Sequence, residues 1–234
     1  MNIADVRNKL KTVGNMEVIF EPSQAFEKNL ISKAKLKDIL EKSVVSLRGW
    51  SFPHIPNQDL EHTKRPYIFE SGLEFFTDWD KFIEMFRLYQ SGQFLARFAL
   101  YEDTIGKLNN KELKPGEYLD FISTIYKFTE IVLFIKNLLE NTNIDKGKLT
   151  IKVNGTKDRK LQTIFSSNII PFWQEYVCKI DSIVVSNKID REILFDHLSV
   201  SRSFIKEAFE YFNCFDISEQ VIKAHQENLI NRRI

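Results

Sequence analysis

The sequence contains little cysteine and glycine. Its 234 residues include two cysteines and eight glycines. Cys178 and Cys214 lie far apart without a Cys-x-x-Cys spacing, which disfavours a disulfide or a zinc site and is typical of a reducing compartment. Few glycines leave little material for a phosphate-cradling loop, and no Gly-rich nucleotide motif, Gly-x-Ser-x-Gly or His-Glu-x-x-His occurs. We therefore expect no metal and no cofactor.

Long apolar runs and an excess of one charge are also lacking. The longest apolar stretch, 131–135, is far shorter than the about 20 residues that cross a bilayer. The first residues read as an amphipathic helix rather than a signal peptide. Basic and acidic residues number 33 and 32, so no global field attracts DNA or a membrane. These features predict a cytoplasmic protein without a membrane partner, in which any nucleic-acid binding depends on a local patch.

Aromatic and aliphatic residues are abundant and indicate a substantial folded core. Hydrophobic residues make up 43% of the chain, and twenty are phenylalanine. Period-two alternation and apolar runs predict short strands over 17–20, 44–47, 67–76, 93–101, 149–153 and 176–185. Helical spacing predicts helices over 3–13, 29–42, 79–91, 117–141, 189–212 and 217–232.

This mixture of elements does not follow a β-α-β rhythm and therefore predicts an α+β fold. We expect a mixed or antiparallel sheet of short strands, packed with at least five helices. The helix over 117–141 is apolar nearly all round, so it is expected to be long and buried. A single domain over 1–234 is predicted, with a helical C-terminus over 189–234 as a candidate appendage.

Two short boxes place large rings beside arginine, histidine or glutamine. The first is SLRGWSFPH over 46–54, and the second is FRLYQSGQF over 86–94. Rings cost little entropy to order, and a neighbouring arginine can pair with anions or stack on bases. Residues 44–103 are therefore the expected working surface. Its candidate binding residues are Arg48, Trp50, Phe52, His54, Arg87, Tyr89, Gln90, Gln93 and Arg97.

A structural interpretation of the same boxes stands beside the functional one. Trp50 and Phe52 would then plug an edge of the core, and Arg48 would meet a carboxylate. On a helix over 79–91, Glu84 and Arg87 would share a face and form an intrahelical ion pair.

Two pairs of residues are candidates for catalysis. The Arg48-x5-His54 pair resembles the arginine and histidine of HEPN-type ribonucleases, where they stabilise phosphate charge and transfer a proton. That motif belongs at the start of a helix, however, and Pro53 disfavours helical backbone at the residue before it. Glu102 and Asp103 follow a predicted strand and resemble part of a nuclease metal site, but further ligands at defined positions are missing. Adjacent carboxylates in a loop are more often solvated.

A basic stretch over 146–160 is a further candidate for phosphate contact. Without interleaved aromatics, it is better interpreted as a solvated outer face of the sheet. Its cations are Lys146, Lys148, Lys152, Lys157, Arg159 and Lys160.

At these boxes the chain resembles an uncharacterised family of bacterial proteins. The shared features are SLRGWxFPH over 46–54, Trp79, RxYQSGQF over 87–94, and FALxED over 98–103. The resemblance covers most of the chain and implies an accessory protein of mobile-element or defence loci. It implies no particular activity, fold or catalytic residue.

No catalytic signature is complete, so the sequence favours a binding subunit without enzymatic activity. In this hypothesis the aromatic and arginine-rich surface over 44–103 receives a protein partner or a nucleic acid, because such anchors are enriched at interfaces. The C-terminal helices could mediate self-association. The alternative is a phosphodiester-cleaving nuclease that uses Arg48 and His54, or Glu102 and Asp103.

Overall fold

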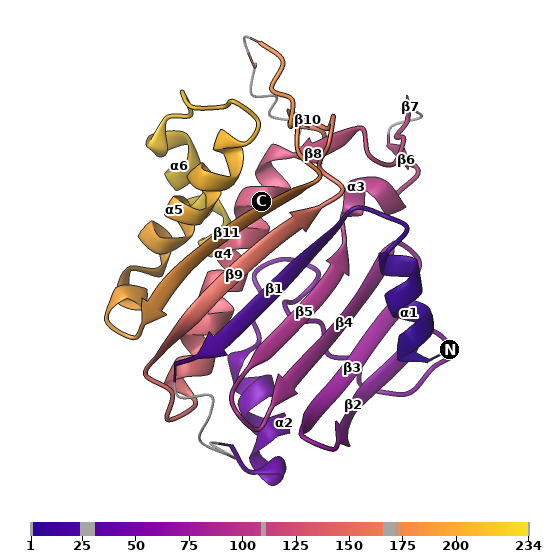
Figure 1. The fold of residues 1–234 in the computed structure, drawn as a ribbon, viewed down its shortest axis with the longest axis vertical. Coiled ribbons are helices and arrows are strands. Elements are labelled where there is room, and N and C mark those ends of the chain that lie inside the picture. The colour runs from indigo at the N-terminus through magenta and orange to yellow at the C-terminus, as the bar shows by residue number, and fades with distance from the viewer. Residues whose placement is uncertain (1, 24–30, 109–110, 166–171, 173, 234) are drawn as a thin grey trace.

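A seven-stranded antiparallel sheet forms the centre of the protein, with the strand order β11-β9-β1-β5-β4-β3-β2 (Figure 1). The computed structural model describes residues 2–23, 31–108, 111–165, 172 and 174–233. The strands of this sheet are β1 (Asn15–Pro22), β2 (Thr63–Phe69), β3 (Gly72–Trp79), β4 (Phe82–Tyr89), β5 (Phe94–Ala99), β9 (Lys146–Asn154) and β11 (Ser182–Asp190). Two small pairs stand apart: β6 (Lys107–Leu108) with β7 (Lys111–Glu112), and β8 (Tyr118–Asp120) with β10 (Lys160–Gln162).

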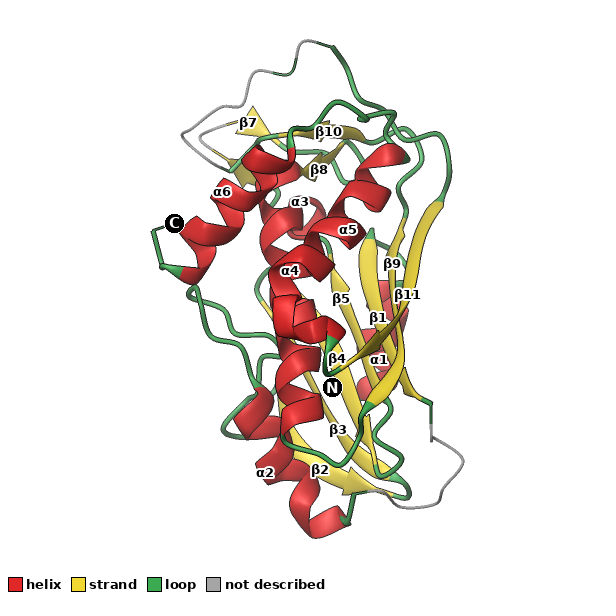
Figure 2. Cartoon of the chain, turned by 90° about the vertical axis from the view of Figure 1, so that its left-hand side faces the viewer, coloured by secondary structure: helices red, strands yellow, loops and turns green. Residues whose placement is uncertain are grey.

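Most of the helices form a layer on one face of the sheet (Figure 2). The long helix α4 (Phe121–Glu140) occupies the middle of this layer and contacts α2 (Lys33–Ser43), α5 (His197–Glu210) and α6 (Glu219–Ile230). A short α3 (Tyr101–Thr104) follows β5, and a 3-10 turn, η1 (Ile193–Asp196), precedes α5. Helix α1 (Ile3–Leu10) packs on the opposite face, against β3, β4 and β5. The expected α+β class with an antiparallel sheet and a helical C-terminus is confirmed.

The main core lies between α4 and the sheet. Phe94, Ala96 and Phe98 alternate along β5 and are all buried, as the period-two pattern predicts. The ring of Phe94 packs on that of Phe134 from α4, with their centroids 4.5 Å apart. The expected long buried helix over 117–141 is present, because α4 turns apolar residues toward the sheet on one side and toward α5 and α6 on the other.

The opposite face of β3 and β4 is also covered. Val6 and Leu10 of α1 form a second small core with Phe76 and Met85. Strands buried on both faces lose the alternation that identifies a strand in the sequence. The prediction of a helix over 79–91 is wrong for this reason: the segment is a turn at Asp80, which has a φ of 55°, followed by β4.

Other boundaries also differ from the prediction. The expected strand over 44–47 is reduced to a single bridge between Val45 and Phe52. The strand expected over 176–185 begins at Ser182, and the helix expected from 189 begins at His197. Of the helix expected over 29–42, residues 29 and 30 lie outside the described part of the chain. Among the described residues, no helix has the length and apolar character needed to cross a membrane.

The C-terminal helices belong to the main core. They contribute the buried side chains of Phe204, Phe209 and Ile222 to the same hydrophobic cluster as the sheet. Near the end of the chain, Arg232 donates a hydrogen bond to the Ser46 carbonyl at 3.1 Å. The last described residues therefore contact the loop that carries the first aromatic box.

Candidate functional site

The first aromatic box forms a closed loop against the core. Val45 and Phe52 exchange two backbone hydrogen bonds, of 2.9 and 2.8 Å, which close the loop at its base. The Phe52 side chain is 1% exposed and makes edge-to-face contacts with core phenylalanines, including Phe98 and Phe134. Phe52 therefore anchors the loop, and residues 48–50 are held over the space between β4 and α4.

Trp50 is the centre of a stack of rings. Its indole packs between His54 and Phe82, each at a centroid distance of 3.8 Å. The indole Nε1 donates a hydrogen bond to Glu84 Oε1 at 3.0 Å. Burial lowers the pKa of His54, and the nearest polar partner of its Nδ1 is Ser51 Oγ at 3.5 Å. The orientation of the Trp50 indole is thus fixed by the two stacked rings and by the hydrogen bond from its Nε1 to Glu84.

A buried group of charges joins this loop to α4. Arg48 donates to Glu130 from Nε at 2.7 Å and from Nη2 at 3.0 Å, which is a bidentate pair. Lys127, one turn earlier on α4, lies 3.1 Å from the same carboxylate. Burial lowers the pKa of the Lys127 ammonium, although Glu130 acts in the opposite sense. Burial alone would raise the pKa of Glu130, but Lys127 and Arg48 outweigh it and lower that pKa.

Glu84 lies on the core face of β4, opposite Phe98 in the strand register. It is 6% exposed, and Trp50 Nε1 is its hydrogen-bond donor. Burial raises its pKa to about 8, while Lys127 and the bond from Trp50 act weakly in the other direction. At neutral pH, Glu84 is therefore mainly a neutral carboxylic acid that can donate a hydrogen bond.

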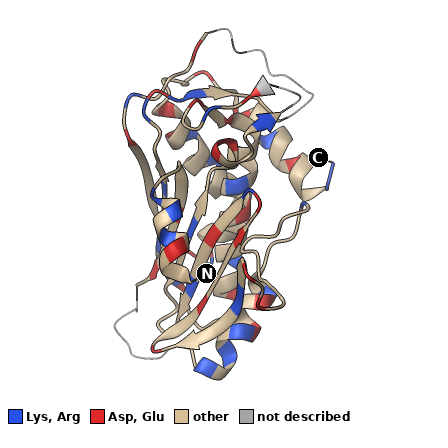
Figure 3. Cartoon of the chain, turned by 90° about the vertical axis from the view of Figure 1, so that its right-hand side faces the viewer, with Lys and Arg blue, Asp and Glu red and all other residues tan. Residues whose placement is uncertain are grey.

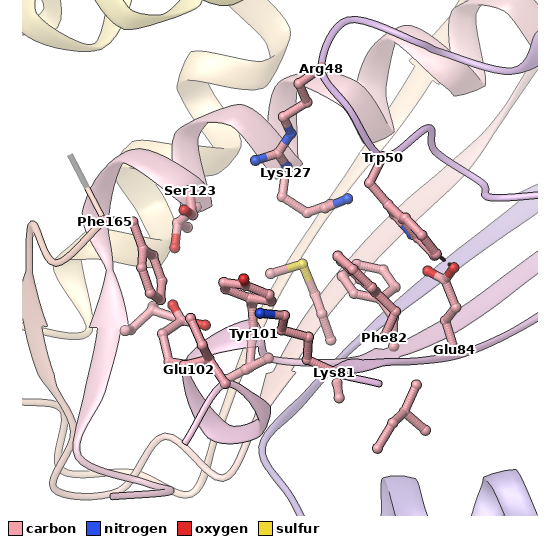
Figure 4. Close-up of a pocket in the computed structure, with 18 of the residues that line it drawn as sticks. Arg48, Trp50, Lys81, Phe82, Glu84, Tyr101, Glu102, Ser123, Lys127 and Phe165 are labelled. Carbon is pink, nitrogen blue, oxygen red and sulfur yellow. Dashed lines mark hydrogen bonds between the residues drawn. The ribbon is translucent and has the colours of Figure 1, made fainter. Parts of the chain in front are cut away.

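Arg48, Trp50, Glu84 and Lys127 line a cavity of about 420 Å³ between β4, β5, α3 and α4 (Figure 4). Its polar and charged lining residues include Arg48, Lys81, Glu84, Glu102, Ser123, Thr124 and Lys127. Much of its remaining wall is apolar and includes Met16, Phe82, Phe98, Leu119 and Phe165. The Arg48 and Lys81 side chains are 23% and 33% exposed, so the cavity reaches solvent near them. Its volume falls in the range of small-molecule sites.

Glu102 and Asp103 are brought to different environments. Glu102 lines the cavity and accepts a hydrogen bond from the Asp120 backbone at 2.6 Å. Burial raises its pKa to about 7. Asp103 instead forms a buried bidentate pair with Arg159, at 2.6 and 2.7 Å. The two carboxylates do not form a joint metal site, and no cluster of three His, Cys, Asp or Glu able to hold a metal occurs in the described residues.

Arg159 also corrects the interpretation of the basic stretch over 146–160. Its side chain is 1% exposed, whereas a solvated sheet face was expected. Besides Asp103, it donates to the carbonyls of Gly155 and Tyr118 at 2.6 and 2.7 Å. The arginine therefore ties the β9–β10 connection to α3 and β8, and it is not available for phosphate.

Arg87 of the second box lies on the opposite face of the sheet from the cavity. Arg87 pairs with Glu74, whose other oxygen accepts a hydrogen bond from Tyr67. The Tyr89 hydroxyl lies 3.4 Å from Arg87 Nη1. Because β4 alternates its side chains, Glu84 and Arg87 point to opposite faces, and the expected intrahelical pair does not exist.

Arg97 also lies on this outer face. It donates to Asn15 at 3.0 Å and lies 3.3 Å from Glu17. Figure 3, which views the molecule from the right-hand side of Figure 1, shows basic and acidic residues interspersed there as well. The outer face is therefore a set of paired charges rather than a basic patch.

The Gln-Ser-Gly-Gln segment of the second box has a local structural role. Gln90 Nε2 donates to the Ile31 carbonyl at 3.3 Å, and the Gln93 backbone N–H donates to Ser91 Oγ at 3.3 Å. Gly92 between them has a φ of 80°, and a Cβ there would lie 2.1 Å from Ile144 Cδ1. The QSGQ sequence thus makes the tight turn between β4 and β5.

Of the candidate binding residues, Arg48 and Trp50 line the cavity, and His54 stacks behind Trp50. Arg48 and His54 do not face each other across a shared space, because His54 is outside the cavity lining. The sequence analysis did not select Glu84, Lys127 or Glu130 as site residues. Lys127 and Glu130 lie in the middle of the most apolar helix. Because lysine and glutamate are rarely buried unless they are paired, their positions were the sequence signal that could have identified them.

Comparison with known proteins adds no relative: no protein family, no curated protein and no solved structure matches this chain.

Proposed function

We propose that the protein binds a small molecule in the cavity beneath the loop that carries Arg48 and Trp50. The observation that carries this proposal is the concentration of ionisable groups in a largely apolar space. Glu84, Glu102 and Lys127 each have a pKa moved toward the neutral form by burial. Perturbed groups that converge in a cavity of this size are typical of binding and active sites.

The binding function expected of residues 44–103 is retained, but the proposed partner is a small molecule rather than a protein or a nucleic acid. A protein or nucleic-acid surface would require the arginines and rings to be accessible together. Phe52 is buried, and Arg48 is paired with Glu130. Arg87 and Arg97 lie on the other face of the sheet, each paired with a carboxylate. This arrangement supports an internal site more than an open docking surface.

A nuclease is less well supported by the same geometry. In each of the two candidate catalytic pairs, only one residue lines the cavity. Arg48 and Glu102 line it, whereas their partners His54 and Asp103 do not. Asp103 accepts hydrogen bonds from Arg159 and from the backbone N–H groups of Gly14 and Gly116, so each of its oxygens already has two donors and is not free to ligate a metal ion. The two buried free cysteines, Cys178 and Cys214, support a reducing compartment such as the cytoplasm for the binding protein.

The cavity can be tested with a neutral apolar dye and a variant that fills the space. Ser123 lines the cavity and is the third residue of α4, where its N–H donates to the helix cap Asp120 at 2.7 Å. Ser199 has the same position in α5, with its N–H donating to Asp196 at 3.0 Å, but it is exposed. Ser123→Trp and Ser199→Trp are therefore matched variants.

Binding of N-phenyl-1-naphthylamine is measured by fluorescence titration for the wild type and both variants. We expect Ser123→Trp to weaken binding at least tenfold, and Ser199→Trp to bind as the wild type does. Circular dichroism and thermal unfolding verify that both variants fold. If Ser123→Trp does not fold, the smaller substitution Ser123→Phe is used in its place. Equal affinity in all folded variants, or no binding to the wild type, would overturn the proposal.

A further inference from the structure

The charges around the cavity do not balance, and this imbalance indicates the class of ligand. Arg48 and Lys127 share a single carboxylate, Glu130, which is fully buried behind them. Among the described residues, Glu130 is the only acid within 4.0 Å of either cation. One carboxylate cannot neutralise two cations. When Lys127 is protonated, the end of the cavity beside α4 therefore carries an excess of positive charge. Burial, which lowers the pKa of Lys127, opposes that charge, and a nearby anion would favour it.

The other acids of the cavity do not supply the missing negative charge. Glu84 interacts with Lys127, but burial keeps most of Glu84 protonated at neutral pH, with a pKa of about 8. Glu102 has a pKa of about 7 and is therefore about half ionised at pH 7, but it accepts a hydrogen bond from the Asp120 backbone and, among the described residues, forms an ion pair with neither Arg48 nor Lys127. The third cation, Lys81, lies 4.0 Å from the exposed Asp80 and over the Tyr101 ring.

The two cations, whose side chains are 23% and 18% exposed, also keep donors besides those directed to Glu130. Glu130 takes the Nε and Nη2 edge of the Arg48 guanidinium, so Nη1 remains able to donate. The Lys127 ammonium lies over the rings of Phe52 and Phe98, at 5.2 and 5.3 Å, and has further N–H groups besides the one directed to Glu130. Desolvating a cation whose charge is only partly neutralised is costly, and a bound anion would reduce this cost.

The rest of the cavity is suited to an apolar body. Figure 4 shows Arg48 and Lys127 entering from one side, with Phe165, Tyr101 and Phe82 placed around the space. The Phe165 ring meets Tyr101 edge-to-face at 5.2 Å. Met16 and Leu119 complete this region of the wall. The cavity is thus amphipathic, with cations at one end and rings and aliphatic side chains elsewhere.

We propose that the ligand is an organic monoanion, with a carboxylate held by Arg48 and Lys127 and an apolar, ring-sized body packed on Phe98, Leu119 and Phe165. This inference rests on the proposed small-molecule function and specifies its ligand. The anion would complete the neutralisation of the two cations that Glu130 begins. Protonated Glu84, held by Trp50, could donate a hydrogen bond to the same carboxylate.

The test compares two ligands that have nearly the same shape and differ in charge. Calorimetric or fluorescence titration at pH 7 measures the affinity for 2-naphthoate and for its neutral amide, 2-naphthamide. We expect the wild type to bind 2-naphthoate at least tenfold more tightly. Equal affinities would overturn the monoanion inference, and a positive result with the neutral dye would show that the cavity itself still binds small molecules.

Lys127→Met provides the second arm, because methionine keeps much of the side-chain volume and leaves the Arg48–Glu130 pair intact. The preference for 2-naphthoate should fall at least fivefold, with little change for 2-naphthamide. Lys136→Met is the matched control, since Lys136 lies on the same helix and pairs with Glu140 at 2.6 Å, outside the cavity lining. A parallel loss of affinity for both ligands in Lys127→Met would contradict a role for its charge.

Discussion

Replacement of Glu84 by glutamine is expected to make the protein more stable in alkaline solution. Glutamine has the shape of the protonated acid and keeps an oxygen that can accept the hydrogen bond from Trp50, which is 3.0 Å long in the wild type. It cannot ionise. Glu84→Gln therefore removes the cost of a buried carboxylate and retains the packing on the core face of β4.

The magnitude follows from the pKa of the buried acid. Burial raises the pKa of Glu84 from 4.5 to about 8, so the folded protein holds this proton more tightly than the unfolded chain does. The resulting stabilisation is complete below about pH 4.5 and is lost as the pH rises to about 8. At about 1.4 kcal/mol for each pKa unit, the change between pH 5 and 8.5 is at most about 4 kcal/mol. Relaxation around the ionised group reduces this, so we expect about 2–4 kcal/mol.

The assay is urea unfolding of the wild type and Glu84→Gln at a series of pH values. The difference between the two free energies of unfolding should be small near pH 5 and should grow toward pH 8.5. This comparison cancels the opposite contribution of His197 and His225, whose pKa values are lowered by burial and which therefore destabilise the fold as the pH falls.

Glu102→Gln is the matched control for this prediction. The pKa of Glu102 is raised to about 7, so its difference from the wild type should stop growing near pH 7 rather than near pH 8. Glutamine keeps an acceptor for the Asp120 N–H. A constant difference between Glu84→Gln and the wild type from pH 5 to 8.5 would refute the assignment of Glu84 as a buried neutral acid.

Two further substitutions test the structural roles of residues near the site, by the midpoint and slope of urea unfolding. Asp103→Ala leaves Arg159 buried and unpaired, so a loss of about 3–5 kcal/mol is expected; Lys179→Ala, which breaks an exposed pair, should cost less than about 1 kcal/mol. Phe52→Ala should cost about 3–5 kcal/mol, because the ring is 1% exposed and packs on several others. Phe195→Ala, at a ring that is 87% exposed, should change stability by less than about 0.5 kcal/mol. Equal losses within either pair would contradict the assigned burial.

The outcome at β4 shows where local pattern stops being informative. Phe82, Ile83 and Phe86 have spacings that fit a helical face, and Asp80 would fall in the first turn of a helix over 79–91. The structure instead uses Asp80 in a turn and places Phe86 and Ile83 on opposite faces of a strand. Both faces are apolar because α4 covers one and α1 covers the other. Because both faces of β4 are buried, its sequence does not alternate, and only the tertiary packing distinguishes this strand from a helix.

The sequence by itself determined the α+β class, the alternating strand β5 and the long buried helix α4, because their periodicities depend on neighbours within each segment. It also directed attention to the loop with Arg48 and Trp50. The site was decided by tertiary structure alone: Glu130 and Arg48 are 82 positions apart, as are Asn15 and Arg97 on the other face. The packing of the sheet against α4 determines which charged residues form ion pairs and which carboxyl group, here that of Glu84, is desolvated.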